Sequence, residues 1–182
     1  MGIFNTNRME VCNVPELGKS ESALYQDISR INHSCAPNCV WSWNKENLAR
    51  KEVRACREIN KGEEIVASYI NFETVLSREE RMNDLENWDF LCQCQVCSKT
   101  GKELEKNEKV RLQIKKLHNE IREHLFRGKV KEALMRARKK LDLMETIKNE
   151  TALWKPDALR MCYELSVKML SLRSFSTKDP KT

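Results

Sequence analysis

Three cysteines within six residues constrain this chain most. Cys92, Cys94 and Cys97 form a C-x-C-x-x-C arrangement, in which the thiols are too close together for each to have a separate structural role. Thiolates select zinc or iron-sulfur centres, and a structural zinc site needs four tetrahedral ligands. The sequence therefore predicts a metal ion with one further ligand. The candidates are a histidine and the cysteines that precede the cluster: Cys12, His33, Cys35, Cys39 and Cys56.

A different interpretation of the cluster is that its cysteines are small, buried apolar residues. The cellular setting favours metal. The first residues lack the basic and apolar regions of a secretory signal, and no run approaches the roughly 20 apolar residues that cross a membrane. We therefore expect an intracellular protein, in the nucleus or the cytoplasm, with no membrane anchor. In a reducing compartment its eight cysteines point to metal before disulfides.

Charge and hydrophobic periodicity divide the 182 residues near residue 100. Residues 1–100 contain 12 Lys and Arg against 15 Asp and Glu, whereas residues 101–182 contain 21 against 12. In the second part, apolar residues recur at helical spacing in three stretches. These predicted helices begin near Val110, Val130 and Pro156. We predict an α+β fold, with a β-rich unit over residues 1–100 and an α-helical C-terminal region over residues 101–182.

The first part is predicted to consist of short strands joined by turns. Three segments have the side-chain alternation or the β-branched and aromatic content of strands: residues 39–43, 53–59 and 65–70. Ser77 is followed three residues later by Glu80, which is a capping-box pattern and predicts a short helix after Ser77.

Residues 32–39, Asn-His-Ser-Cys-Ala-Pro-Asn-Cys, resemble the N-H-S-C-x-P-N motif of SET-domain protein lysine methyltransferases. Residues 62–69 resemble the second motif of this family, a G-E-E-[IL] turn that leads into a strand ending in tyrosine. The clustered cysteines at 92–97 look like the zinc motif that follows the SET domain. With a helical region behind them, the chain is most similar to the SET and MYND subgroup and its fungal relatives. The resemblance implies a partial SET domain with a post-SET zinc motif over residues 1–100.

The resemblance also implies which residues bind the cofactor and the metal. Asn32 and His33 match residues that hold S-adenosylmethionine, largely through backbone contacts and the Asn amide. Asn7 matches a residue at the methionine end of the cofactor. The cysteine of the N-H-S-C motif is a zinc ligand in this family, so Cys35 would complete the set with the three clustered cysteines. Cys39 and Cys56 then become small buried apolar residues.

Catalysis would centre on Tyr69, which matches the active-site tyrosine of the family. Its hydroxyl can orient the lysine amine and favour the neutral form of that amine. Phe90 resembles an aromatic residue that forms a wall of the lysine channel. Without the resemblance, Tyr69 is an aromatic residue at a strand end that packs in a core, and Trp41 and Trp88 are interpreted in the same way. The implied function is S-adenosylmethionine-dependent methylation of a lysine in a protein substrate, for example a histone.

The chain also departs from the family pattern. No two of its five glycines are two residues apart, so the G-x-G of the first SET strands is absent and we expect an N-terminally truncated enzyme. The alternative function is a non-catalytic, zinc-stabilised protein-interaction module. Residues 108–140 carry 12 Lys and Arg against 4 Asp and Glu, which is typical of a solvated helix face. No nucleic-acid motif accompanies them, so nucleic acid is not an expected partner.

Overall fold

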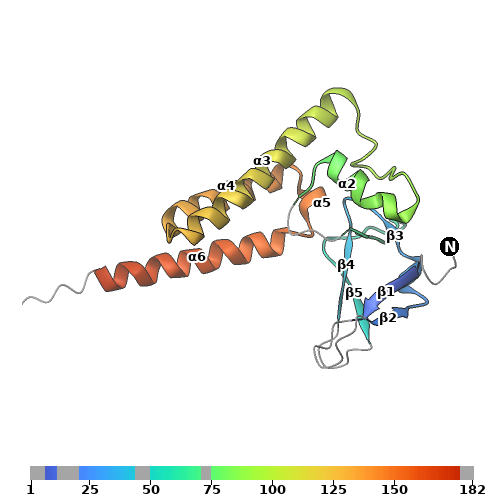
Figure 1. The fold of residues 1–182 in the computed structure, drawn as a ribbon, viewed down its shortest axis with the longest axis horizontal. Coiled ribbons are helices and arrows are strands. Elements are labelled where there is room, and N and C mark those ends of the chain that lie inside the picture. The colour runs from blue at the N-terminus through green and yellow to red at the C-terminus, as the bar shows by residue number, and fades with distance from the viewer. Residues whose placement is uncertain (1–6, 12–20, 44–49, 71–74, 177–182) are drawn as a thin grey trace, which may run out of the picture. The chain divides into compact units, whose positions relative to one another are not determined.

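The structure is a computed structural model that describes residues 7–11, 21–43, 50–70 and 75–176 (Figure 1). The chain forms two compact units. One, here called the strand unit, comprises residues 1–71 and 82–98, and the other, the helical unit, comprises residues 72–81 and 99–182. The short segment 72–81 therefore groups with the helices that follow it. The assignment of residues 1–100 to a partial SET domain and of residues 101–182 to a helical C-terminal region stays a prediction.

The strand unit contains three two-stranded sheets in its described part. Two of them are antiparallel pairs, β1 (Arg8–Val11) with β2 (Glu21–Leu24) and β4 (Cys39–Trp43) with β5 (Lys51–Ala55). The third is a parallel pair, β3 (Asn32–His33) with β6 (Val66–Ala67). Together with the helices, these short strands confirm the predicted α+β class. The predicted strand at 39–43 is observed with the same bounds, whereas the other two are shorter than predicted or shifted.

The buried side chain of Asn38 joins the two motif segments of the strand unit. Its amide nitrogen donates to Glu63 Oε1 at 3.0 Å and to the carbonyl of Glu64 at 2.8 Å, while its oxygen accepts the Val66 N–H at 2.9 Å. Glu63 also accepts a hydrogen bond from Arg57 at 2.5 Å. Because both the donors and the acceptor of Asn38 are satisfied, it links the segments without leaving an unpaired polar group.

The helical unit is built on three long helices. They are α3 (Gly101–Phe126), α4 (Val130–Thr146) and α6 (Lys155–Ser176), and α4 packs against both of the others (Figure 1). A short helix, α5 (Lys148–Thr151), connects α4 to α6. The first helix begins before the predicted Val110 because residues 101–109 are rich in Lys and Glu, which favour helix. Gly128, with φ of 69°, occupies the left-handed turn between α3 and α4.

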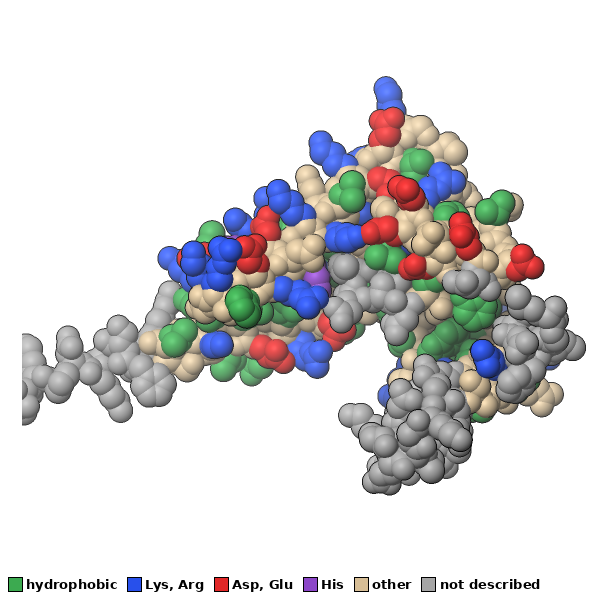
Figure 2. Space-filling model, in the orientation of Figure 1, with side chains coloured by type: hydrophobic (Ala, Val, Ile, Leu, Met, Phe, Trp, Pro, Cys, Tyr) green, Lys and Arg blue, Asp and Glu red, His purple; other side chains and the backbone are tan. Residues whose placement is uncertain are grey.

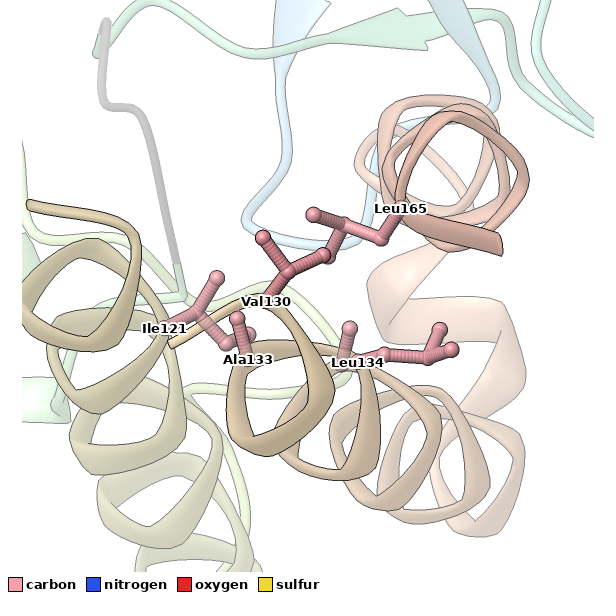
Figure 3. Packing of buried hydrophobic residues seen from close by; sticks show 6 residues of the cluster. Ile121, Val130, Ala133, Leu134 and Leu165 are labelled. Carbon is pink, nitrogen blue, oxygen red and sulfur yellow. The ribbon is translucent and has the colours of Figure 1, made fainter. Parts of the chain in front are cut away.

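Two clusters of buried side chains form the core of the helical unit. Figure 3 shows the first, in which residues of all three long helices meet: Ile121, Val130, Ala133, Leu134, Ala137 and Leu165. The second brings residues from the segment before α2 together with α3, α4 and α6: Val75, Ile114, Met144, Trp154 and Ala158. Val75 is 1% exposed, and its place in this cluster explains why residues 72–81 belong to the helical unit.

The predicted capping box is present at the start of α2 (Arg78–Leu85). The Glu80 N–H donates to Ser77 Oγ at 3.2 Å, and the Ser77 N–H donates to Glu80 Oε2 at 2.8 Å. Each residue thus satisfies an N–H that the first helical turn leaves without an intrahelical partner. The helix is preceded by Leu76, whose carbonyl accepts hydrogen bonds from the buried guanidinium groups of Arg81 and Arg111.

Charged side chains cover much of the helical surface, and Lys and Arg lie among Asp and Glu (Figure 2). Several form ion pairs along or between helices, such as Arg136 with Glu120 at 2.6 Å and Arg127 with Glu123 at 2.6 Å. This arrangement fits the expected solvated face. None of the described helices combines the length and the apolar character needed to cross a membrane.

Candidate metal centre and aromatic site

The structure brings the three clustered cysteines together with Cys35. The four Sγ atoms of Cys35, Cys92, Cys94 and Cys97 lie within 4.8 Å of one another. Cys35 Sγ is 3.9 Å from Cys92 Sγ and 3.5 Å from Cys97 Sγ. Sulfurs at the corners of a tetrahedron around zinc, with Zn–S of about 2.3 Å, are about 3.8 Å apart. The donor set and its spacing therefore fit one zinc ion.

Two other candidate ligands, Cys39 and Cys56, do not join this cluster. Cys39 Sγ donates to the Val66 carbonyl at 3.3 Å, and Cys56 Sγ donates to the Pro37 carbonyl at 3.4 Å. Cys12 lies outside the described residues. Cys39 is 2% exposed, as expected for a small buried residue, whereas Cys56 is only half-buried.

The four thiols perturb one another because they share hydrogen bonds in a buried site. Hydrogen bonds from Cys35 and Cys92 lower the pKa of Cys97 from 9.0 to about 7. Hydrogen bonds from Cys35, Cys92 and Cys97 also hold the pKa of Cys94 far below its ordinary value. In return, hydrogen bonds to Cys92, Cys94 and Cys97 raise the pKa of Cys35. The pKa of Cys92 is raised as well, so protonated Cys35 and Cys92 stabilise anionic sulfur at Cys94 and Cys97. A metal ion would replace the remaining thiol protons, because thiolate is the form that binds metal.

His33 lies between this cluster and Tyr69. Its Nδ1 accepts the backbone N–H of Tyr69 at 3.0 Å, and its Nε2 lies 3.3 Å from Cys35 Sγ. The backbone position of His33 is set by the parallel pairing of β3 and β6, in which His33 is opposite Ala67.

The hydroxyl of Tyr69 donates to the carbonyl of Ile31 at 2.7 Å. Tyr69 is therefore held at its backbone by His33 and at its hydroxyl by the residue before β3. Burial raises the pKa of Tyr69 above its ordinary value of 10.0, because the charged phenolate is disfavoured away from water. At neutral pH the side chain is a protonated phenol.

Aromatic rings surround Tyr69. Its ring centroid lies 4.7 Å from that of Trp88, 6.2 Å from that of Trp41 and 6.3 Å from that of Phe90. Trp88 and Phe90 remain 37% and 39% exposed, so this group of rings borders the solvent. The interpretation of Trp88 as a core or sheet-face residue is wrong, since it lies partly exposed against Tyr69.

A left-handed turn explains why Trp88 and Phe90 both reach Tyr69. Asp89 between them has φ of 59°, the one positive value at a non-glycine position in the described chain. Asp tolerates this region better than most residues. Trp88 ends the 3₁₀ helix Glu86–Trp88, and Asp89 directly after it has the left-handed conformation. The sequence carries no strong signal for this conformation, because neither Gly nor Asn is present at position 89.

The two predicted cofactor asparagines occupy different parts of the strand unit. Asn32 is exposed in β3, next to His33, and its amide donates to Glu64 Oε1 at 2.7 Å. Sequence reasoning missed Glu64 as its partner. Asn7 is half-buried directly before β1, whose sheet is separate from the one that contains Asn32. The cofactor roles of Asn7, Asn32 and His33 stay predictions.

Comparison with known proteins supports the resemblance. Residues 4–70 match the family model of the SET domain. The chain is 35% identical over 119 residues to the N-lysine methyltransferase SMYD2 of Homo sapiens, covering 65% of this chain and 25% of the relative. It is 30% identical over 157 residues to SMYD2-B of Danio rerio, covering 86% and 32%.

A fungal relative is also similar. The histone-lysine N-methyltransferase SET5 of Meyerozyma guilliermondii is 33% identical over 104 residues, covering 57% of this chain and 19% of the relative. The chain spans about a quarter of the length of the first curated relatives that it matches. The SET-domain match, the ordered motifs and the four-cysteine cluster agree with one another: residues 4–70 belong to the SET-domain family, and the chain is similar to these protein lysine methyltransferases.

Proposed function

We propose that this chain carries the catalytic tyrosine and the metal site of an S-adenosylmethionine-dependent protein lysine methyltransferase. The observation that carries the proposal is the placement of Tyr69. Its hydroxyl is fixed on the Ile31 carbonyl, its backbone is fixed on His33, and its ring borders the partly exposed rings of Trp88 and Phe90. The SET-domain match and the lysine methyltransferase relatives support the same reaction.

The reaction requires a neutral amine. S-adenosylmethionine, when bound, supplies a methyl group on a positively charged sulfur. A lysine near its ordinary pKa of about 10.4 must lose a proton before its lone pair can attack that methyl carbon. Because the Tyr69 hydroxyl donates to Ile31, its remaining lone pairs can accept an N–H of the incoming lysine. Burial keeps Tyr69 protonated, so it orients the amine and does not remove the proton.

The neighbouring rings would guide the lysine. Trp88 and Phe90 present partly exposed aromatic surfaces beside Tyr69. Aromatic faces attract ammonium groups within about 6 Å of the ring centroid. We therefore assign Phe90, with Trp88, to the wall of the lysine channel. Orientation of the amine along one direction supplies much of the rate in a displacement of this kind.

Two sets of residues would hold the bound groups. The exposed amide of Asn32 and the carboxylate of Glu64 offer a donor and an acceptor beside β3, which fits the polar end of S-adenosylmethionine. We assign Asn32, His33 and Asn7 to the cofactor. The zinc ion would be held by Cys35 and the three clustered cysteines, and would fix the loop that follows Phe90 against the residues after β3.

The test is a methyl-transfer assay with the zinc-loaded chain, labelled S-adenosylmethionine and histones as a lysine-rich probe. Tyr69→Phe removes one oriented hydrogen bond, so we expect activity to fall about 10- to 100-fold, corresponding to roughly 1.5–3 kcal/mol. Tyr163→Phe is the matched control, since Tyr163 is 70% exposed in the helical unit.

Two results would contradict the proposal. Equal activities of the parent and Tyr69→Phe would remove the role of Tyr69. If calorimetry detects no binding of S-adenosylmethionine to the zinc-loaded chain, the enzyme hypothesis for this chain is wrong and a non-catalytic interaction module becomes the better explanation.

A further inference from the structure

The ring of His33 contacts two groups through its two nitrogens. The Tyr69 N–H donates to Nδ1 at 3.0 Å, so Nδ1 carries no proton. The proton of the neutral ring is therefore on Nε2, and Nε2–H points to Cys35 Sγ at 3.3 Å. The hydrogen bond from Tyr69 thus selects the tautomer that donates to the sulfur.

The ring has little freedom to leave this position. His33 is half-buried, its ring centroid lies 5.9 Å from that of Phe90 and 5.4 Å from that of Tyr69, and its backbone pairs with β6. The next residue continues this pairing, since the Ser34 N–H donates to the Ala67 carbonyl at 2.9 Å. A shift of Cys35 Sγ would therefore displace the ring itself, or break its hydrogen bond to the sulfur.

We propose that His33 is a positioning residue that couples the four-cysteine cluster to Tyr69. A hydrogen bond to a ligating sulfur orients that sulfur and stabilises the negative charge of a metal thiolate. Through the other ring nitrogen, the same residue fixes the backbone of Tyr69. Occupation of the cysteine cluster by metal therefore restrains Tyr69. The importance of this restraint for catalysis rests on the proposed function, but the coupling itself does not.

Two substitutions separate the two hydrogen bonds of His33. The side-chain oxygen of Asn stands where Nδ1 stands in His, so His33→Asn keeps the acceptor for Tyr69 and loses the donor to Cys35. The side-chain nitrogen of Gln reaches the position of Nε2, so His33→Gln keeps the donor and loses the acceptor. His124→Asn, in the helical unit, is the control.

Zinc affinity is measured by competition with a chromophoric chelator, and the thiolate-to-metal charge-transfer absorption is measured with cobalt in place of zinc. We expect His33→Asn to bind zinc about 10- to 100-fold more weakly and to shift the cobalt band. We expect His33→Gln and the control to keep the parent values. These readouts require neither cofactor nor substrate, so they stand or fail independently of methyl transfer.

The second measurement is the rate at which the backbone amide proton of Tyr69 exchanges with solvent, determined by NMR on the isotope-labelled chain. In the parent, zinc addition should slow its exchange with solvent. His33→Gln should lose this protection because it lacks the acceptor for the Tyr69 N–H. His33→Asn should keep a hydrogen-bonded Tyr69 amide, but zinc addition should no longer change its exchange rate, because the donor to Cys35 is lost. Three outcomes would each overturn the proposal: a zinc affinity of His33→Asn equal to that of the parent, a Tyr69 amide in zinc-loaded His33→Gln as protected as in the parent, or an exchange rate in His33→Asn that zinc still slows. If one variant does not fold, the other still decides, because each has its own predicted readout.

Discussion

Asn38 offers a sharp test of how the two motif segments are held together. Its side chain is 0% exposed and makes hydrogen bonds to Glu63, to the Glu64 carbonyl and to the Val66 N–H. Asn38→Ala removes all three. The backbone hydrogen bonds of Asn38 to Val66 and Cys56 remain, so the substitution acts on the side-chain links alone.

The expected loss of stability follows from the groups left behind. The Val66 N–H loses its acceptor and the Glu64 carbonyl loses a donor; a buried unsatisfied group costs about 1–3 kcal/mol. Because Glu64 is exposed and its carbonyl has better access to water, the Val66 N–H dominates. With the small cavity left by the amide, the strand unit should lose about 3 kcal/mol of its free energy of unfolding.

Hydrogen exchange with mass spectrometry measures this loss in each unit of the intact chain. Peptides from residues 32–43 and 50–70 should exchange faster in Asn38→Ala, while peptides from α3 and α4 should not change. Asn119→Ala is the control, since Asn119 is exposed on α3. A change of less than about 0.5 kcal/mol in the strand unit, the size typical of a surface substitution, would refute this account of Asn38.

Two further predictions concern the metal and pH. The parent should contain one zinc per chain by elemental analysis and Cys35→Ser should lose it, whereas Cys39→Ser should keep it because Cys39 donates to the Val66 carbonyl; zinc retained in Cys35→Ser would refute the assigned ligand set. Hydrogen bonds from Arg57 and Asn38 lower the pKa of Glu63 from 4.5 to about 2. The ionised carboxylate therefore stabilises the fold above pH ~4.5, and this contribution is lost as the pH falls towards ~2. In denaturant titrations, the stability difference between the parent and Glu63→Gln should narrow over that range, and a constant difference would contradict the prediction.

Much of the fold and of the candidate metal site could be predicted because the signals are local. The spacing of Cys92, Cys94 and Cys97 indicates a shared ion, and Ser77 with Glu80 indicates a helix start that the structure confirms. The resemblance to SET-domain enzymes added Cys35, which sequence spacing alone left among several candidates.

The remaining features depend on contacts that no local pattern encodes. Val75 joins the helical core through residues far along the chain, so the grouping of residues 72–81 with the helices could not be predicted from periodicity. Hydrophobicity alone predicts a core or sheet-face position for Trp88, because the left-handed turn at Asp89 has no signal in the sequence. The tautomer of His33 likewise depends on the backbone of Tyr69, which is 36 positions away.

The cysteine cluster has a consequence for how the chain folds. Cys35 and Cys92 are 57 positions apart, and the intervening segment carries β4, β5, β6 and Tyr69. A link that closes a loop of this length removes about 4 kcal/mol of conformational entropy from the unfolded ensemble, by the estimate used for covalent cross-links. Binding of the ion before folding would therefore bring β3 and β6 together and speed the formation of their pairing. A chelator should slow the refolding of residues 35–92 and also lower their stability.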